Sequence, residues 1–222
     1  MTAILFVCMI FLGNRQVERL QWKLGLIAQI ESRAFADPIL LPVRADNLDD
    51  MEYLSIKMQG SFNNDQEMTL YSVGPNGEAG YDLYTPFFND GGQVVIVNRG
   101  WVPEFMKDQE TRPETLKTGD VIIEGLLRKP SVKLWFGPEN EPSNNNWFYR
   151  DIDAMAKAQN LNSVYPMFLY AARMENDNRY PVAGRTEFNI VNNHLDYVLT
   201  WYGLAIVLII IYLIAHIHKK DE

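Results

Sequence analysis

The chain has 222 residues, enough for one domain or two, and 47% of them are hydrophobic, which excludes a wholly disordered protein. Its formal net charge of −8 argues against a general nucleic-acid binder, because such proteins carry an excess of Lys and Arg. Cys8 is the one cysteine, so neither an intramolecular disulfide nor a Cys-rich zinc site can form.

The first part of the chain predicts two consecutive helical segments. Residues 1–13 carry no charged side chain and are mostly apolar. They predict a first transmembrane helix, although a full span needs ~20 residues. The short length indicates a thin crossing or a start codon placed too late. In residues 14–35, apolar residues recur at helical spacing from Val17 to Ile27. This second segment is expected either to lie at the membrane interface or to pack on the soluble domain.

Residues 36–196 predict an external domain made mainly of strands. Asn89-Asp-Gly-Gly92 predicts a hairpin turn. One helix is expected over residues 151–159, with Asp151 as its N-cap. Strand-forming runs bounded by turn residues cover 53–59, 68–73, 81–85, 86–88, 93–98, 121–128, 147–150 and 164–172. This pattern favours a β-rich α+β domain, either an antiparallel sheet or a small barrel.

The C-terminal part of the chain predicts a second transmembrane helix over residues 197–215. This run is uncharged, and at ~1.5 Å per residue it approaches the ~30 Å thickness of a hydrocarbon core. A buried core helix is the alternative, but no polar face interrupts the run. Lys219 and Lys220 follow the span, so the positive-inside tendency predicts a cytoplasmic tail at 216–222 and places the main domain outside.

Several short motifs occur in the same order as in a known family. The sequence resembles the Surfeit-locus cytochrome oxidase assembly family, and the matches run from residue 12 to about residue 205. Arg15 is a departure, because the family usually has Trp there. The matching segments are Leu12-Gly13 with Gln16, Arg19 and Trp22-Lys23, then Gly80–Pro86, Val97–Pro103, Gly125–Arg128, Asn146-Trp147 with Asp151, Asn192–Tyr197 and Thr200–Tyr202.

The resemblance implies a membrane factor that helps to build the haem-copper terminal oxidase of a respiratory chain. For bacterial members it implies transient binding of haem A and help with its insertion. The expected partners are oxidase subunit I, haem A synthase and membrane lipid, with no nucleic acid. Because no Arg-rich, acidic-poor presequence is visible, the expected location is a bacterial inner membrane, with a multi-pass chain and the main domain on the periplasmic or external side.

His194 is the candidate axial ligand for haem iron that the resemblance implies. It lies just before the second predicted span, and a neutral imidazole is a standard ligand of this kind. The alternative is an interfacial histidine that caps the helix or packs on the domain. Arg185, Arg15 and Arg19 would lie near the same membrane face and could pair with haem propionates. Snorkelling toward lipid phosphate is the alternative for all three.

Asn98, Arg99 and Trp101 are candidate partner-binding residues after a strongly apolar strand. The alternative, which we favour, is a turn in which Arg99 satisfies backbone carbonyls and Trp101 fills the core. His216 and His218 lie two residues apart, so they predict a solvated tail rather than a metal clip.

Three classes of function remain open at this point. We expect a non-enzymatic assembly factor that binds haem A. The alternative is a scaffold that stabilises an oxidase assembly intermediate without holding a cofactor. A membrane-anchored hydrolase is disfavoured, because no nucleophile-elbow glycine pattern is found.

Overall fold

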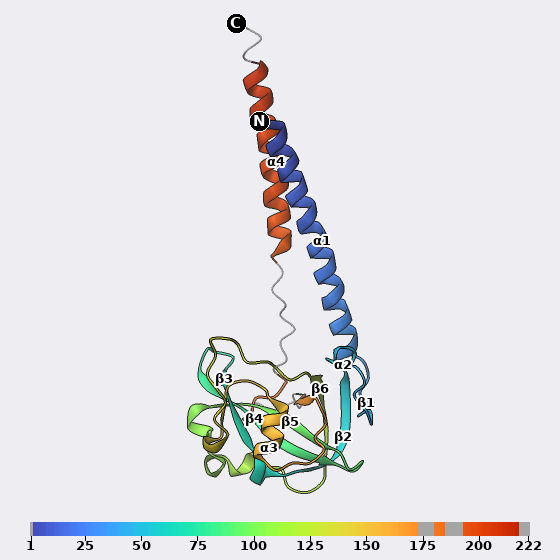
Figure 1. Ribbon diagram of the computed structural model, residues 1–222, viewed down its shortest axis with the longest axis vertical. Coiled ribbons are helices and arrows are strands. Elements are labelled where there is room, and N and C mark those ends of the chain that lie inside the picture. The colour runs from blue at the N-terminus through green and yellow to red at the C-terminus, as the bar shows by residue number, and fades with distance from the viewer. Residues whose placement is uncertain (1, 173–179, 185–192, 218–222) are drawn as a thin grey trace. The chain divides into compact units, whose positions relative to one another are not determined.

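The computed structural model describes residues 2–172, 180–184 and 193–217 (Figure 1). The chain divides into two compact units. We call Ser32–Glu187 the barrel unit, and Met1–Glu31 together with Phe188–Glu222 the helical unit.

The barrel unit is built on one sheet that closes on itself. Its strand order is β1-β2-β6-β8-β5-β4-β3-β7, and an additional pairing joins β2 to β4. Strands β2, β6, β8, β5 and β4 therefore form a ring. The strands are β1 Ile39–Leu40, β2 Ser55–Phe62, β3 Met68–Val73, β4 Ala79–Asn89, β5 Val94–Pro103, β6 Val121–Arg128, β7 Asn146–Trp147 and β8 Phe168–Ala171.

The small-barrel alternative of the sequence prediction is thus confirmed, but the sheet is not purely antiparallel. Three pairs of strands are parallel, namely β1–β2, β3–β7 and β5–β8. The closing pair, β2–β4, is antiparallel and joins Gly60 to Asn89. Short helices decorate the barrel: α2 Leu48–Met51, α3 Ile152–Ala158, and the 3-10 turns Asn64–Gln66, Glu104–Met106, Gln109–Thr111, Pro113–Thr115 and Pro142–Asn144.

Local sequence signals set several of these elements. The predicted hairpin joins β4 to β5, where the Asn89 amide donates to the Gln93 carbonyl at 3.0 Å and Gly92 adopts a φ of +78°. Asp151 caps α3, because its carboxylate accepts from the Ala154 amide at 3.0 Å. Two strand predictions were too long, since residues 164–172 contribute only β8 and residues 147–150 only the end of β7.

Two apolar cores lie on opposite faces of the β5 strand, whose ten residues are all buried. Alternation along β5 sends Val95 and Val97 into one core and Ile96 into the other. The first core fills the barrel with Met51, Ile56, Met58, Phe87, Val95, Val97, Ile123, Leu127, Tyr165, Met167 and Leu169. The second lies under α3 and contains Met68, Leu70, Tyr84, Ile96, Trp147, Ile152, Met155 and Phe168.

The helical unit contains α1, Thr2–Ala34, and α4, His194–Ile217. One continuous helix, α1, covers both segments predicted at 1–13 and 14–35, and its last residues, 32–34, belong to the barrel unit. Among the described residues, one helical stretch is long and apolar enough to cross a membrane, and it is His194–Ala215. The second predicted span is therefore supported, whereas the first span stays a prediction.

Candidate functional site

The predicted ligand, His194, is the first residue of α4 and is half-buried. Its ring nitrogen Nδ1 lies 2.9 Å from Oε1 of Gln16 on α1. An amide oxygen can only accept, so this contact requires the Nδ1 proton and leaves Nε2 as the lone-pair nitrogen of the neutral ring. Among the described residues, Nε2 has no hydrogen-bond partner.

Close packing of α1 on α4 holds this pair of residues in place. A Cβ atom on Gly13 would lie 2.6 Å from Cε1 of Tyr202, so only glycine permits this approach. The Tyr202 hydroxyl donates to Oδ1 of Asn14 at 2.6 Å. Figure 1 shows α1 and α4 side by side, and the contacts show that they run in opposite directions. The polar contacts therefore form a cluster at which the uncharged part of α1 ends.

The predicted propionate-binding arginines have different places. Arg15 and Arg19 are both exposed on α1, and their i, i+4 spacing puts them on one face of the helix. Arg19 also lies one turn after Gln16. Arg185 lies outside the described residues. Arg15 and Arg19 therefore lie within about one helical turn of Gln16, the α1 residue that contacts the His194 imidazole.

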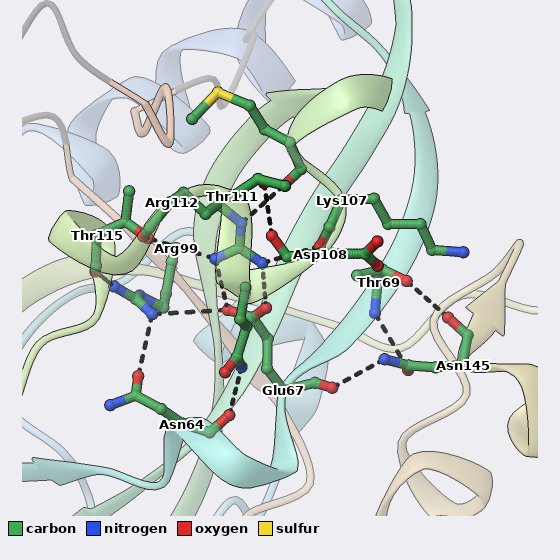
Figure 2. A network of polar contacts seen from close by, with 12 residues as sticks. Asn64, Glu67, Thr69, Arg99, Lys107, Asp108, Thr111, Arg112, Thr115 and Asn145 are labelled. Carbon is green, nitrogen blue, oxygen red and sulfur yellow. Dashed lines mark hydrogen bonds and ion pairs between the residues drawn. The ribbon is translucent and has the colours of Figure 1, made fainter.

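The barrel unit contains a second polar cluster, and it is deeply buried. Figure 2 shows the Glu67 carboxylate between the guanidinium groups of Arg99 and Arg112. The side chain of Glu67 is 2% exposed and that of Arg112 is 0% exposed. Arg112 contacts both carboxylate oxygens, and Arg99 Nη1 lies 3.6 Å from Oε2. Burial in this cluster lowers the pKa of the Arg99 guanidinium, and the Glu67 carboxylate opposes that shift.

The remaining donors of this cluster are satisfied by backbone. Arg112 donates through Nε to the Met106 carbonyl at 2.8 Å and through Nη2 to the Lys107 carbonyl at 3.1 Å. Arg99 donates to the Thr115 carbonyl and, at 3.2 Å, to the side chain of Asn64. These bonds tie the loop that follows β5 to the start of β3. Because these charged groups are buried and paired with one another and with the backbone, the role of the cluster is to stabilise the fold.

The candidate partner-binding residues on β5 are all buried. Trp101 is packed against Gly74 and Gly80, where an added Cβ would come within 2.6 Å of its ring. Asn98 accepts from the Gly100 amide at 2.8 Å and donates to the Tyr84 hydroxyl at 3.2 Å. Arg99 is engaged by Glu67. A role of Asn98, Arg99 and Trp101 in partner binding stays a prediction, and their internal contacts do not favour it.

A pair of tyrosines, Tyr84 and Tyr170, meets at the second core. The hydroxyl groups of Tyr84 and Tyr170 lie 2.8 Å apart, and Arg150 Nη1 donates to the Tyr170 hydroxyl at 2.5 Å. Burial, aided by the neighbouring Tyr170, raises the pKa of Tyr84 well above its ordinary value. The buried Tyr84 hydroxyl therefore keeps its proton well above neutral pH; it accepts from the Asn98 amide, and in its contact with Tyr170 either hydroxyl could donate.

Comparison with known proteins identifies the family. The model of the SURF1 family matches residues 3–206, which is most of the chain. The chain belongs to the SURF1 family. Surfeit locus protein 1 of Mus musculus is 37% identical over 87% of this chain and 67% of its own length. The Homo sapiens protein of that name is 34% identical over 87% of this chain and 69% of its own length.

More distant SURF1 relatives match at similar identity. A SURF1-like protein of Caenorhabditis briggsae is 32% identical over 94% of this chain and 70% of its own length. The SURF1 family comprises cytochrome c oxidase assembly factors, so the resemblance noted in the sequence is confirmed. These relatives are eukaryotic, and they leave the expected bacterial location a prediction.

Sequence reasoning missed several residues that the structure brings together. Gln16 was noted only as part of a family motif, and its bond to His194 spans 178 positions. Glu67 and Arg112 are isolated charges in loop sequence, 45 positions apart, and no local pattern marks them as partners. Among the described residues, no group of three or more His, Cys, Asp or Glu side chains could hold a metal ion.

Proposed function

We propose that this chain is a membrane assembly factor for cytochrome c oxidase that binds haem A through His194. The observation that carries the proposal is the His194–Gln16 contact, which orients the imidazole and leaves Nε2 available for a metal. Family membership supports the assembly role.

The residues of the helical unit fit such a ligand in three respects. His194 would hold the haem iron, and the exposed Arg15 and Arg19 would pair with the propionates. The uncharged side chains of α4 suit the apolar substituents of the macrocycle. Haem A would supply the redox-active iron of the mature oxidase, and the part of this chain is to bind, orient and release it. Arg185, the fourth predicted residue, belongs to the same proposal from its sequence position alone.

The direct test is haem A binding by the purified full chain in detergent, followed by its Soret absorption. We expect His194→Ala to weaken binding at least tenfold, because the iron loses its protein ligand. His216→Ala is the matched control, since it removes another histidine of α4 beyond the predicted span. Equal binding by the wild-type chain and His194→Ala would refute the ligand role.

A test in cells distinguishes the scaffold alternative from haem A binding. Membranes from a deletion strain should lose the a-type haem signal in reduced-minus-oxidised spectra and keep the b- and c-type signals. If His194→Ala restores the a-type signal as well as the wild-type gene does, the protein acts as a scaffold. Partners of the haem-binding form would be oxidase subunit I and haem A synthase, and co-purification with either checks this expectation.

For the membrane arrangement, we infer two crossings with the barrel unit on the external side of a bacterial inner membrane. The contact of Gly13 with Tyr202 supports this arrangement, because it aligns the uncharged start of α1 with the apolar half of α4. In a Cys8→Ser background, a membrane-impermeant maleimide added to spheroplasts should label Asn76→Cys in an exposed turn. It should leave Lys219→Cys in the tail unlabelled, and the reverse pattern would overturn the orientation.

A further inference from the structure

Arg150, a residue of the barrel unit just before α3, carries a positive charge that pairs with no carboxylate among the described residues. Its Nη1 donates to the Tyr170 hydroxyl at 2.5 Å, but no ion pair joins it to a described Asp or Glu side chain. Its Nε is buried and has no hydrogen-bond partner among these residues. A guanidinium cannot lose its proton in a protein, so the charge persists. A buried polar atom without a protein partner calls for a water molecule or a ligand.

A second guanidinium lies against the same tyrosine ring. The guanidinium carbon of Arg150 is 5.7 Å from the centre of the Tyr170 ring, and that of Arg128 is 5.4 Å from it. The Nε of Arg128 lies 3.4 Å from the Glu52 carboxylate, which also lies 3.0 Å from Nζ of Lys129. Glu52 thus contacts two cations already, and it does not neutralise a third.

The strands and one short loop contact fix both guanidinium groups. Arg128 on β6 and Tyr170 on β8 project from the outer face of the sheet, because the residues beside them point into the barrel core. The Ser131 amide donates to the Arg150 carbonyl at 3.0 Å, and the Arg150 amide donates to Oγ of Ser131 at 2.9 Å. The Nη2 of Arg150 forms no hydrogen bond to a described residue and is not one of the buried polar atoms, so this side of the guanidinium is open to a ligand.

The charges around this site favour a monovalent anion. Three cations, Arg128, Lys129 and Arg150, face two contacting carboxylates, those of Glu52 and Asp49. One further carboxylate would balance the excess, and guanidinium groups form their strongest hydrogen bonds with oxyanions of this kind. A divalent anion such as phosphate would reverse the sign of the site. The formal net charge of −8 on the whole chain also opposes a more highly charged ligand.

We propose that Arg150, with Arg128 beside it, is the binding site for a carboxylate that does not come from the described part of this chain. The Nη2 of Arg150 donates to the carboxylate, and Arg128 adds a second positive charge next to it. Tyr170 positions both guanidinium groups. The carboxylate belongs either to a small organic acid or to the C-terminus of a peptide. The site lies within the barrel unit, so it depends neither on haem binding nor on a membrane.

The test is thermal unfolding of the purified full chain in detergent near pH 8, followed by circular dichroism. Sodium acetate is compared with sodium chloride at equal ionic strength. Acetate should raise the unfolding midpoint of the wild-type chain by about 2–4 °C, because it binds the native state alone. Equal midpoints of the wild-type chain in the two salts would overturn the proposal, and this measurement needs no variant.

Two variants test whether Arg150 is the site of this effect. Arg150→Gln removes the charge and keeps an amide that can donate to the Tyr170 hydroxyl, so the effect of acetate should disappear. Arg44→Gln is the matched control, because Arg44 is an exposed arginine of the same unit and should show the full effect of acetate when replaced. If Arg150→Gln responds to acetate as the wild-type chain does, the site is wrong. His194→Ala should respond normally, which separates this proposal from haem binding.

Further ligands identify the chemistry and the source of the anion. Sodium phosphate at the same ionic strength should raise the midpoint less than acetate does, and a larger rise would refute a carboxylate site. N-acetyl-diglycine should act like acetate, whereas its amide should have no effect, and an equal effect of the amide would also refute the proposal. If the free peptide acts at a concentration at least tenfold lower than acetate, a peptide C-terminus is the source. Equal concentrations indicate a small organic acid.

Discussion

The Glu67 cluster of the barrel unit and the His194–Gln16 pair of the helical unit differ in how far their polar atoms are paired. Glu67 is 2% exposed, and the guanidinium groups around it donate to carboxylate, amide and backbone oxygens. His194 is half-buried, and one of its two ring nitrogens has no partner among the described residues. The Glu67 cluster is internally paired, whereas His194 keeps a ring nitrogen without a partner among the described residues.

This difference explains why the most conspicuous charges of the chain are not its candidate site. A buried ion pair contributes to a fold only when each charge is compensated, and a fully compensated pair has nothing left for chemistry. A half-paired imidazole at a helix terminus keeps that capacity, while its bonded nitrogen sets its orientation. The same reasoning separates Arg99, whose guanidinium is engaged, from the exposed Arg15 and Arg19.

The largest effect is expected for Glu67→Gln, which leaves two buried guanidinium groups without a countercharge. The free energy of unfolding should fall by about 3–5 kcal/mol, the cost of removing one partner of a buried pair. Urea unfolding of the full chain in detergent, followed by tryptophan fluorescence, measures the change.

The matched control is Glu124→Gln. Glu124 pairs with Lys57 at 2.8 Å, but both side chains are about half exposed, at 45% and 48%. Its loss should cost at most about 1 kcal/mol. If Glu67→Gln and Glu124→Gln lower the free energy of unfolding equally, the barrel unit does not depend on the Glu67 cluster more than on an exposed ion pair.

An intermediate effect is expected for Gln16→Ala, which removes the hydrogen-bond acceptor of His194 without removing the proposed ligand. Affinity for haem A should fall by about 10- to 100-fold, as for other partners that orient a metal-bound histidine. The unfolding midpoint of the barrel unit should not change. Gln21→Ala, an exposed glutamine of the same helix, is the control and should bind haem A normally. Unchanged affinity in Gln16→Ala would show that the contact orients nothing.

An effect smaller than that of Glu67→Gln is expected for Tyr84→Phe, and it should depend on pH. Near pH 8 the variant should lose about 1–3 kcal/mol, since the Asn98 amide and the Tyr170 hydroxyl each lose a buried partner. The raised pKa of Tyr84 means that the native state keeps a proton which the unfolded state releases above a pH of about 10. That part of the wild-type stability is present below pH 10 and is lost as the pH rises further.

The difference in the free energy of unfolding between the wild-type chain and Tyr84→Phe should therefore become smaller between pH 8 and pH 11. Urea midpoints of both proteins at the two pH values measure this difference in stability. A gap that stays constant or widens would mean that Tyr84 is not held protonated by the fold.

Several elements could be predicted because their causes lie within a few residues. The turn at 89–92 follows from its Asn and Gly residues, and the start of α3 follows from Asp151. The apolar run of α4 needs no partner to be recognised. By contrast, the predicted strand at 164–172 was too long, because Tyr165 meets β5 only at a single bridge near Val94 before β8 begins.

The sequence by itself determined the location of most strands along the chain, the hairpin, the helix cap, the apolar C-terminal helix and, through its ordered motifs, the family. Each of these depends on local conformational preference or on composition, which a linear pattern contains. The tertiary structure decided that β2 pairs with β4 to close the barrel, that Arg112 is paired with Glu67, and that Gln16 orients His194. These contacts join residues many positions apart, and only the packing of the whole unit determines which distant polar groups leave water together.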